Sequence, residues 1–192
     1  MRSDNRLDEK TYLNLRATTA NIPRFYALLK THKENIPIRP IVSFIDSPTY
    51  NLAKFLAKTL KEITHKSQYI LKNSHTAKDF LANIVIPENH TLVSFDVKNL
   101  FTCIPHTYVL LSVEKALDKQ ENQSIFLNTA LKKADILNLV KLCLSSTTFQ
   151  WNQQFYNQII GTPMGSPISV ALAELSMQHF EDTVVTNSPY PV

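Results

Sequence analysis

Apolar side chains recur at helical spacing in five stretches of the chain, which predicts five amphipathic helices. Three of them have clear starts, at Ser47 followed by Pro48, at Pro105, and at Ser166 followed by Pro167, since serine caps helices and proline fits their first turn. Another is expected to begin near Ser74. The faces expected to be buried are Leu52, Phe55, Leu56, Leu60 and Ile63; Phe80, Leu81 and Ile84; Val109, Leu110, Val113 and Leu117; Ile136, Leu139, Val140, Cys143 and Leu144; and Ile168, Ala171, Leu172, Leu175 and His179.

Two β-hairpins are expected from short runs rich in β-branched and aromatic residues. Residues 23–30 and 38–43 flank a polar turn, and Pro37 and Pro40 confine the second run to a sheet edge. Residues 148–158 carry alternating aromatic residues around a tight turn at Asn152 and Gln153. The chain therefore mixes helices and strands.

Residues 91–97, with the sequence TLVSFDV, form the strongest candidate strand. The run is apolar almost throughout, so we expect it to be buried on both faces. Asp96 lies near its end, where a carboxylate is costly unless it is paired, hydrogen-bonded or bound to a metal. A lone buried aspartate is more often a cap or an ion-pair partner than a metal ligand, so Asp96 alone does not define a site.

Composition narrows the possible classes of protein. The chain has 192 residues, of which 44% are hydrophobic and 19% charged, as in an ordered globular domain. It has only two glycines, Gly161 and Gly165, where average usage would give about 13. This excludes a Rossmann fingerprint, a P-loop and a kinase glycine loop. No run of apolar residues is long enough to span a bilayer, and the N-terminal residues lack the apolar stretch of a signal peptide. We therefore expect a nuclear or cytoplasmic protein without membrane contact.

Charge is distributed unevenly along the chain. The formal net charge is +4, but residues 24–72 carry nine Lys or Arg against three Asp or Glu, and residues 73–192 carry seven against ten. A basic first third suggests a polyanionic partner, although a plain solvated surface gives the same count. The two cysteines, 40 residues apart, lack metal-site spacing and suggest a reducing compartment.

Four stretches, in order, give this chain a family resemblance. They are PRFYALLKTHKENIPIRPIVSF (23–44), SPTYNLAKFLA (47–57), LVSFDVKNLFTCIP (92–105) and FQWNQQFYNQIIGTPMGSPISVALAEL (149–175). With them the chain resembles, from about residue 23 to 182, the reverse transcriptase domain of Penelope-like retroelements. The resemblance implies an α+β fold with the fingers and part of the palm of a right-hand polymerase. Residues 1–22 would be an N-terminal extension, 23–89 fingers-like, and 90–192 palm-like with inserted helices.

The resemblance implies RNA-directed DNA polymerase activity, in which a dNTP is added to the 3′-hydroxyl of a DNA primer on an RNA template. Two Mg²⁺ ions would activate that hydroxyl and neutralise the triphosphate. Asp96 would be the catalytic metal ligand, with the carbonyl of Val97 as a second donor. Phe101 matches the family position whose bulky side chain excludes a ribose 2′-hydroxyl. An ordinary phenylalanine of the hydrophobic core would give the same sequence pattern.

Two further groups of residues match nucleotide-binding and template-binding positions of the family. Lys30 and Arg39 would hold the triphosphate, Arg39 through its planar guanidinium. Met164 and Gly165 would lie against the incoming nucleotide. The remaining loop positions, expected to face template and primer, are Gly161, Pro163 and Ser166. The glycines would then stand where a side chain would collide with the templating base pair, so Gly165→Val should spare the fold.

The chain also departs from the family. Met164 stands where many relatives carry glutamine, Leu29 replaces an expected proline, and Gln153 replaces a glycine. No Tyr-x-Asp-Asp-like motif follows the helix expected after Ser166, and a thumb and an endonuclease are absent too, so the resemblance implies a fragment that is inactive alone. Two alternatives stay open: a non-catalytic nucleic-acid-binding remnant, and a pseudogene-like product. Oligomeric state is not predicted.

Overall fold

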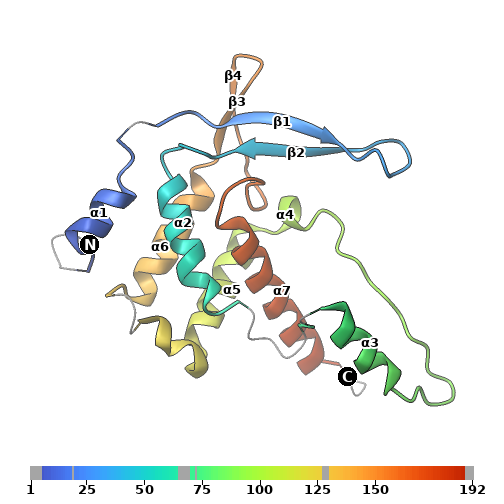
Figure 1. Cartoon of the computed structure of the whole chain (residues 1–192). Helices are drawn as coiled ribbons and strands as arrows, with labels where there is room; N and C mark the ends of the chain where they lie inside the picture. Colours follow the sequence, from blue (N-terminus) through green and yellow to red (C-terminus); the bar gives the residue numbers. More distant parts are fainter. Residues whose placement is uncertain (1–5, 19, 65–69, 72, 127–129, 189–192) are drawn as a thin grey trace.

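The computed structural model describes residues 6–18, 20–64, 70–71, 73–126 and 130–188. Helices coexist with a mixed four-stranded sheet, which confirms the α+β class. In Figure 1 the sheet lies above helices α2, α5, α6 and α7, and α3 is set apart to one side. The elements are α1 (Glu9–Leu15), β1 (Arg24–Leu29), β2 (Ile38–Ser43), α2 (Tyr50–Lys61), α3 (Ser74–Ala82), α4 (Leu100–Cys103), α5 (His106–Asp118), the 3₁₀ helix η1 (Gln120–Phe126), α6 (Lys133–Ser145), β3 (Thr148–Trp151), β4 (Gln154–Asn157) and α7 (Ser169–Thr186).

Helices α2, α5, α6 and α7 share one hydrophobic core, and four of the five predicted apolar faces point into it. Each fully buried leucine or isoleucine stabilises the fold by roughly 1.5–3 kcal/mol. The side chains with the least exposure include Leu56, Leu60, Ile63, Val109, Val113, Leu117, Ile136, Val140, Leu144, Ile168, Leu172 and Leu175.

The sheet has the strand order β2-β1-β3-β4. Strand β1 pairs antiparallel with β2 and parallel with β3, and β3 pairs antiparallel with β4. Both predicted hairpins are confirmed. The turn of the second has φ of 49° at Asn152 and 63° at Gln153, the signs that a type I′ turn requires.

Strand β2 lies at the sheet edge, as its prolines predict. The Val42 N–H donates to Met164 O at 2.9 Å, so it points away from β1. Because N–H groups alternate in direction along an antiparallel strand, the nitrogen of Pro40 also faces away from β1. Proline at this position therefore removes no ladder hydrogen bond.

Helices α2 and α7 begin later than predicted. Helix α2 starts after Thr49 and α7 after Ile168, rather than at Ser47 and Ser166. In each case a turn comes first: Tyr50 N donates to Ser47 O at 3.1 Å, and Ser169 N donates to Ser166 O at 3.2 Å. The Ser-Pro pairs thus start a turn that leads into the helix.

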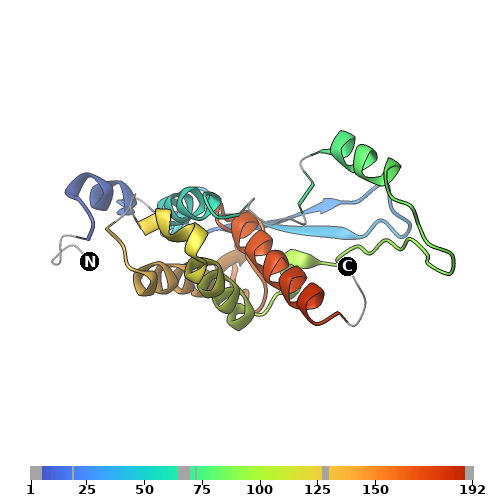
Figure 2. The ribbon, with the colours of Figure 1, turned by 90° about the horizontal axis from the view of Figure 1, so that it is seen from below.

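The predicted buried strand at residues 91–97 is wrong. These residues form no strand, and Phe95 is 92% exposed. Such an apolar run is buried only between partner strands and covering helices, and none of the described strands pairs with it. In Figure 2 the segment runs outside the helical body.

Helix α3 begins at Ser74 as predicted, with Asn73 accepting from Thr76 N at 2.9 Å. Its predicted burial is wrong, because Phe80, Leu81 and Ile84 are all at least 40% exposed. Figure 2 shows α3 standing apart from the helices of the core, and no residue of α3 belongs to the described core cluster.

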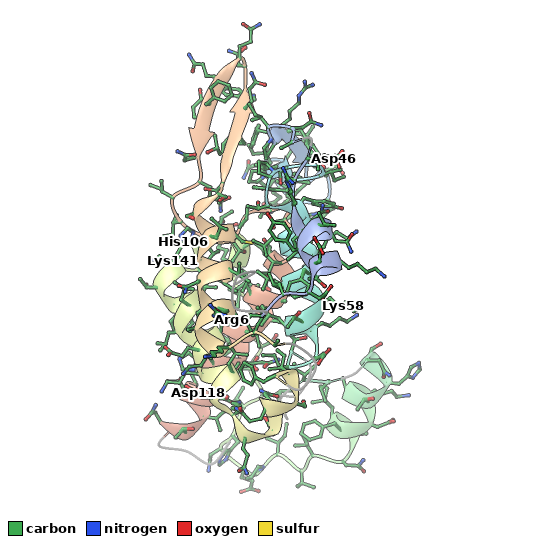
Figure 3. All side chains as sticks on the ribbon, turned by 90° about the vertical axis from the view of Figure 1, so that its left-hand side faces the viewer. Arg6, Asp46, Lys58, His106, Asp118 and Lys141 are labelled. Carbon is green, nitrogen blue, oxygen red and sulfur yellow. The ribbon has the colours of Figure 1, made fainter. Side chains whose placement is uncertain are left out.

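The N-terminal extension joins the helical body. Arg6 Nη1 lies 2.5 Å from the Asp135 Oδ1 atom of α6, and the Asp8 side chain caps α1 by accepting from Thr11 N at 2.8 Å. Burial alone would raise the pKa of Asp135, but the Lys132 N–H and the Arg6 guanidinium outweigh it and hold that pKa below its usual value. The extension is therefore attached by a half-buried ion pair, and Figure 3 places Arg6 beside the helices.

Candidate functional site

The segment 161–167, here called the glycine loop, connects three distant parts of the chain. Gly161 N donates to Ile104 O at 3.1 Å, and Thr162 N donates to Phe101 O at 2.6 Å. On the other side of the loop, Met164 O accepts a hydrogen bond from the Val42 N–H. The loop thus joins strand β2 to the helix that follows Asp96.

Neither glycine tolerates a side chain, because the chain's own backbone fills the space. Gly161 has φ of 82°, and a Cβ there would lie 2.5 Å from Phe101 O. Gly165 has φ of 110°, and its Cβ would overlap Val42 O. The expectation that Gly165→Val spares the fold is therefore wrong: the close approach that requires glycine is internal.

The cationic residues of the first hairpin share one face of the sheet. Arg39 lies opposite Leu28, Ile41 opposite Tyr26 and Ser43 opposite Arg24, and directly paired residues point to the same side. We call this the arginine face. By alternation along β1, Lys30 continues it just beyond the strand end, where Lys30 N donates to Pro37 O at 2.9 Å.

The structure brings the glycine loop next to the arginine face. A Cβ on Gly165 would lie 3.8 Å from Ile41 Cγ2, and Ile41 is followed two residues away on the same face by Arg39. Arg39 is exposed and Lys30 half-buried, and neither forms an ion pair with any residue that the structure describes. Their charges are therefore available to a ligand.

The loop residues differ in accessibility. Gly161 and Pro163 are buried, and Pro163 O accepts from the hydroxyl of Ser169 at 2.6 Å. Met164 and Ser166 are half-buried, and Gly165 is exposed. Of the predicted template and nucleotide contacts in the loop, Met164, Gly165 and Ser166 can reach a ligand, and Gly161 and Pro163 support them from beneath.

Asp96 and Val97 lie outside this cluster, in the exposed extended segment. Within the described ranges, no group of three His, Cys, Asp or Glu side chains is arranged to hold a metal ion. Mg²⁺ takes six oxygen ligands, usually one or two carboxylates together with water and substrate phosphates, so Asp96 and the Val97 carbonyl could supply two of them. The two-metal centre stays a prediction.

Phe101 is half-buried, and its ring packs against the hydrophobic core. Its carbonyl accepts from Thr162 N at 2.6 Å and from Thr162 Oγ1 at 3.3 Å. The residue therefore anchors the glycine loop through its backbone.

Sequence reasoning missed two side chains that hold the loop. His106 Nε2 lies 2.8 Å from Gly161 O, and since a carbonyl only accepts, Nε2 carries the hydrogen. Gln158 Nε2 donates to Ile160 O at 2.8 Å and to Thr162 O at 3.3 Å. Neither follows from a motif, although His106 comes directly after Pro105, the predicted helix start.

The acidic pair Glu181 and Asp182 lies in helix α7. Burial, and then the neighbouring charge of Asp182, raises the pKa of Glu181. Asp182 accepts from Lys119 Nζ at 2.8 Å, so it is held by a surface ion pair.

No protein-family model matches the chain. No curated protein matches it either. Within the described residues, no helix combines the length and the apolar character needed to cross a membrane.

Proposed function

We propose that the chain is the template-, primer- and nucleotide-binding part of a reverse transcriptase domain of the Penelope-like type, with the fingers and part of the palm of a right-hand polymerase. One observation carries the proposal. The glycine loop is hydrogen-bonded on one side to the strand that carries Arg39 and on the other to the helix that follows Asp96. Three stretches spread over more than 120 residues, which the resemblance assigns to one site, thus meet at this loop through the backbone of Val42, Phe101 and Ile104.

In this proposal Arg39 and Lys30 bind the triphosphate of the incoming dNTP. A guanidinium can grip two phosphate oxygens at once, and both cations lack a carboxylate partner within the described residues. The exposed backbone at Gly165 and the thioether of Met164 form the floor beside them, against which a sugar or base would pack. RNA template and DNA primer would pass over the same edge of the sheet.

The proposal assigns binding and positioning to this chain, and no turnover. When Mg²⁺ is bound in a polymerase, it activates the primer hydroxyl and neutralises the phosphates. Asp96 and the Val97 carbonyl could supply two oxygen ligands, but no group of three His, Cys, Asp or Glu side chains among the described residues is arranged to hold a metal ion. That same observation favours one alternative, a non-catalytic nucleic-acid-binding module.

Fluorescence anisotropy distinguishes the reverse transcriptase proposal from the non-catalytic binding module. The probe is a labelled RNA–DNA primer–template whose primer ends in a dideoxynucleotide. We expect the next complementary dNTP to tighten binding several-fold, a non-complementary dNTP to have no effect, and Arg39→Gln to remove the difference. Lys58→Gln is the matched control, because Lys58 is an exposed cation on α2, away from the sheet face. A plain binding module would show salt-dependent affinity without dNTP discrimination.

Primer extension with Mg²⁺ or Mn²⁺ provides the second readout. We expect no incorporation by the chain alone. Incorporation that Asp96→Ala abolishes would overturn the restriction to binding, and a folded chain that binds no primer–template would overturn the proposed function itself.

A further inference from the structure

A row of four side chains crosses the whole sheet on the arginine face. Arg24 lies opposite Ser43 on β2 and beside Gln150 on β3, and Gln150 lies opposite Phe155 on β4. Paired residues point to the same side of a sheet. The Ser43 hydroxyl, the Arg24 guanidinium, the Gln150 amide and the Phe155 ring therefore lie in a line across the strands. We call these four residues the transverse row.

A hollow of about 540 Å³ opens at this row. No acidic side chain lines it, and Arg24 forms no ion pair with any described residue. The four strands together contain two arginines and no aspartate or glutamate, so the sheet is positively charged. The residues lining the hollow are Ala20, Asn21, Ile22, Arg24, Ser43, Ile45 and Gln150.

Aromatic rings flank the hollow on the same face. Phe155 is 59% exposed, and Tyr26, two residues along β1 from Arg24, is 47% exposed. Among the ring contacts of the described residues, Phe155 has none. Figure 3 shows the β3–β4 hairpin standing clear of the body, with side chains in the open on both sides.

The opposite face differs, because its rings contact one another. Phe25 lies 5.8 Å from Phe149 and 6.2 Å from Trp151, between ring centroids, and Phe149 stacks on Tyr156 at 5.7 Å. These rings pack the two hairpins together. Phe155 has no such role, so its exposure calls for another explanation.

We infer that the transverse row binds an unpaired stretch of nucleic acid. Phe155 stacks on a base, the Gln150 amide hydrogen-bonds a base edge, and Arg24 binds the adjoining phosphate. Arg24 is four residues along β1 from Leu28, the partner of Arg39, or about 13 Å at strand spacing. The row is therefore a separate position from the one proposed for the triphosphate. The inference rests on the proposed function for the identity of its ligand.

The test is anisotropy on short labelled single strands of RNA and of DNA, with an abasic strand of equal length as the third probe. We expect Phe155→Ala to lower affinity for the base-bearing strands about tenfold and to leave the abasic strand unchanged. Phe155→Tyr should retain the affinity and Phe155→Leu should not. Arg24→Gln should weaken all three probes and lower the salt slope by about one.

Trp151→Ala is the matched control, since Trp151 lies on the same hairpin, is 53% exposed, and points to the opposite face. Equal effects of Phe155→Ala and Trp151→Ala, each checked for folding by circular dichroism, would overturn the inference. So would equal binding of abasic and base-bearing strands. Tighter binding of the RNA strand or of the DNA strand would support the site and show which nucleic acid the site prefers.

The same assays separate this inference from the proposed function. If Arg39→Gln abolishes dNTP discrimination and Phe155→Ala does not change single-strand binding, the inference about the transverse row is refuted and the proposed function is not. If Phe155→Ala weakens single-strand binding and the primer–template shows no dNTP discrimination, the proposed function fails and the row stands.

Discussion

The glycine loop and residues 91–97 both overlap stretches that carry the family resemblance, and they have opposite structural fates. In the loop, Gly161, Thr162 and Met164 all hydrogen-bond to backbone groups at least 50 residues away. In the other segment, the backbone of residues 91–97 makes no backbone hydrogen bond within the described part of the chain. Residues 91–97 contain four hydrophobic side chains, whereas the loop contains only Met164. The difference teaches that burial follows from available partners, not from composition.

The largest expected effect comes from filling the space at Gly165. We expect Gly165→Val to lower the free energy of unfolding by at least about 4 kcal/mol, because a Cβ overlaps Val42 O and φ is 110°. Urea denaturation followed by circular dichroism measures it. Ser94→Val, in the exposed segment, is the control and should stay within about 0.5 kcal/mol. A stable Gly165→Val protein would break the comparison.

A smaller effect is expected from emptying the core beneath the loop. Leu172 is fully buried, so Leu172→Ala should cost about 3 kcal/mol through lost contacts and the cavity left behind. Phe95 is 92% exposed, so Phe95→Ala should change stability by less than about 0.5 kcal/mol, although it removes a larger side chain. Thermal and urea unfolding of both variants measure this contrast. If Phe95→Ala instead lowered the free energy of unfolding by more than about 2 kcal/mol, the Phe95 side chain would have to be buried.

The smallest effect concerns the N-terminal attachment and depends on pH. The folded-state pKa of Asp135 lies below its ordinary value of 3.8, so the ion pair with Arg6 stabilises the protein fully above that value. Its contribution is lost as the pH falls through the lower folded pKa. Arg6→Ala should therefore cost about 1–2 kcal/mol at pH 7 and progressively less toward pH 3. Unfolding curves at several pH values test this, and a cost that does not shrink below pH 4 would contradict it.

The helices and hairpins could be predicted because their signals are local. Leu56, Leu60 and Ile63 repeat at helical spacing, and Asn152 followed by Gln153 separates two aromatic runs by two residues. The buried faces of four helices followed from the same pattern. The starts of α2 and α7 were misplaced because a Ser-Pro pair also begins a turn.

The burial of residues 91–97 and of α3 could not be predicted, because it depends on neighbours that no local pattern specifies. Phe95 and Phe80 have the composition of core residues and are both exposed. Of the predicted site residues, Arg39, Met164 and Gly165 lie around one strand edge, while Asp96 lies in the exposed segment; their roles stay a prediction. His106 gave no signal because its partner, Gly161 O, is a backbone atom 55 residues away.

The outer edge of β2 has a consequence for how this domain meets other chains. An open sheet edge can recruit a strand from a second molecule and so begin aggregation. Along β2, Pro40 offers no donor and the Val42 N–H is already taken by Met164 O, so two successive outward positions cannot accept an incoming strand. Strand β4, the other outer strand of the sheet, contains no proline. An added strand is therefore expected at the β4 edge rather than along this part of β2.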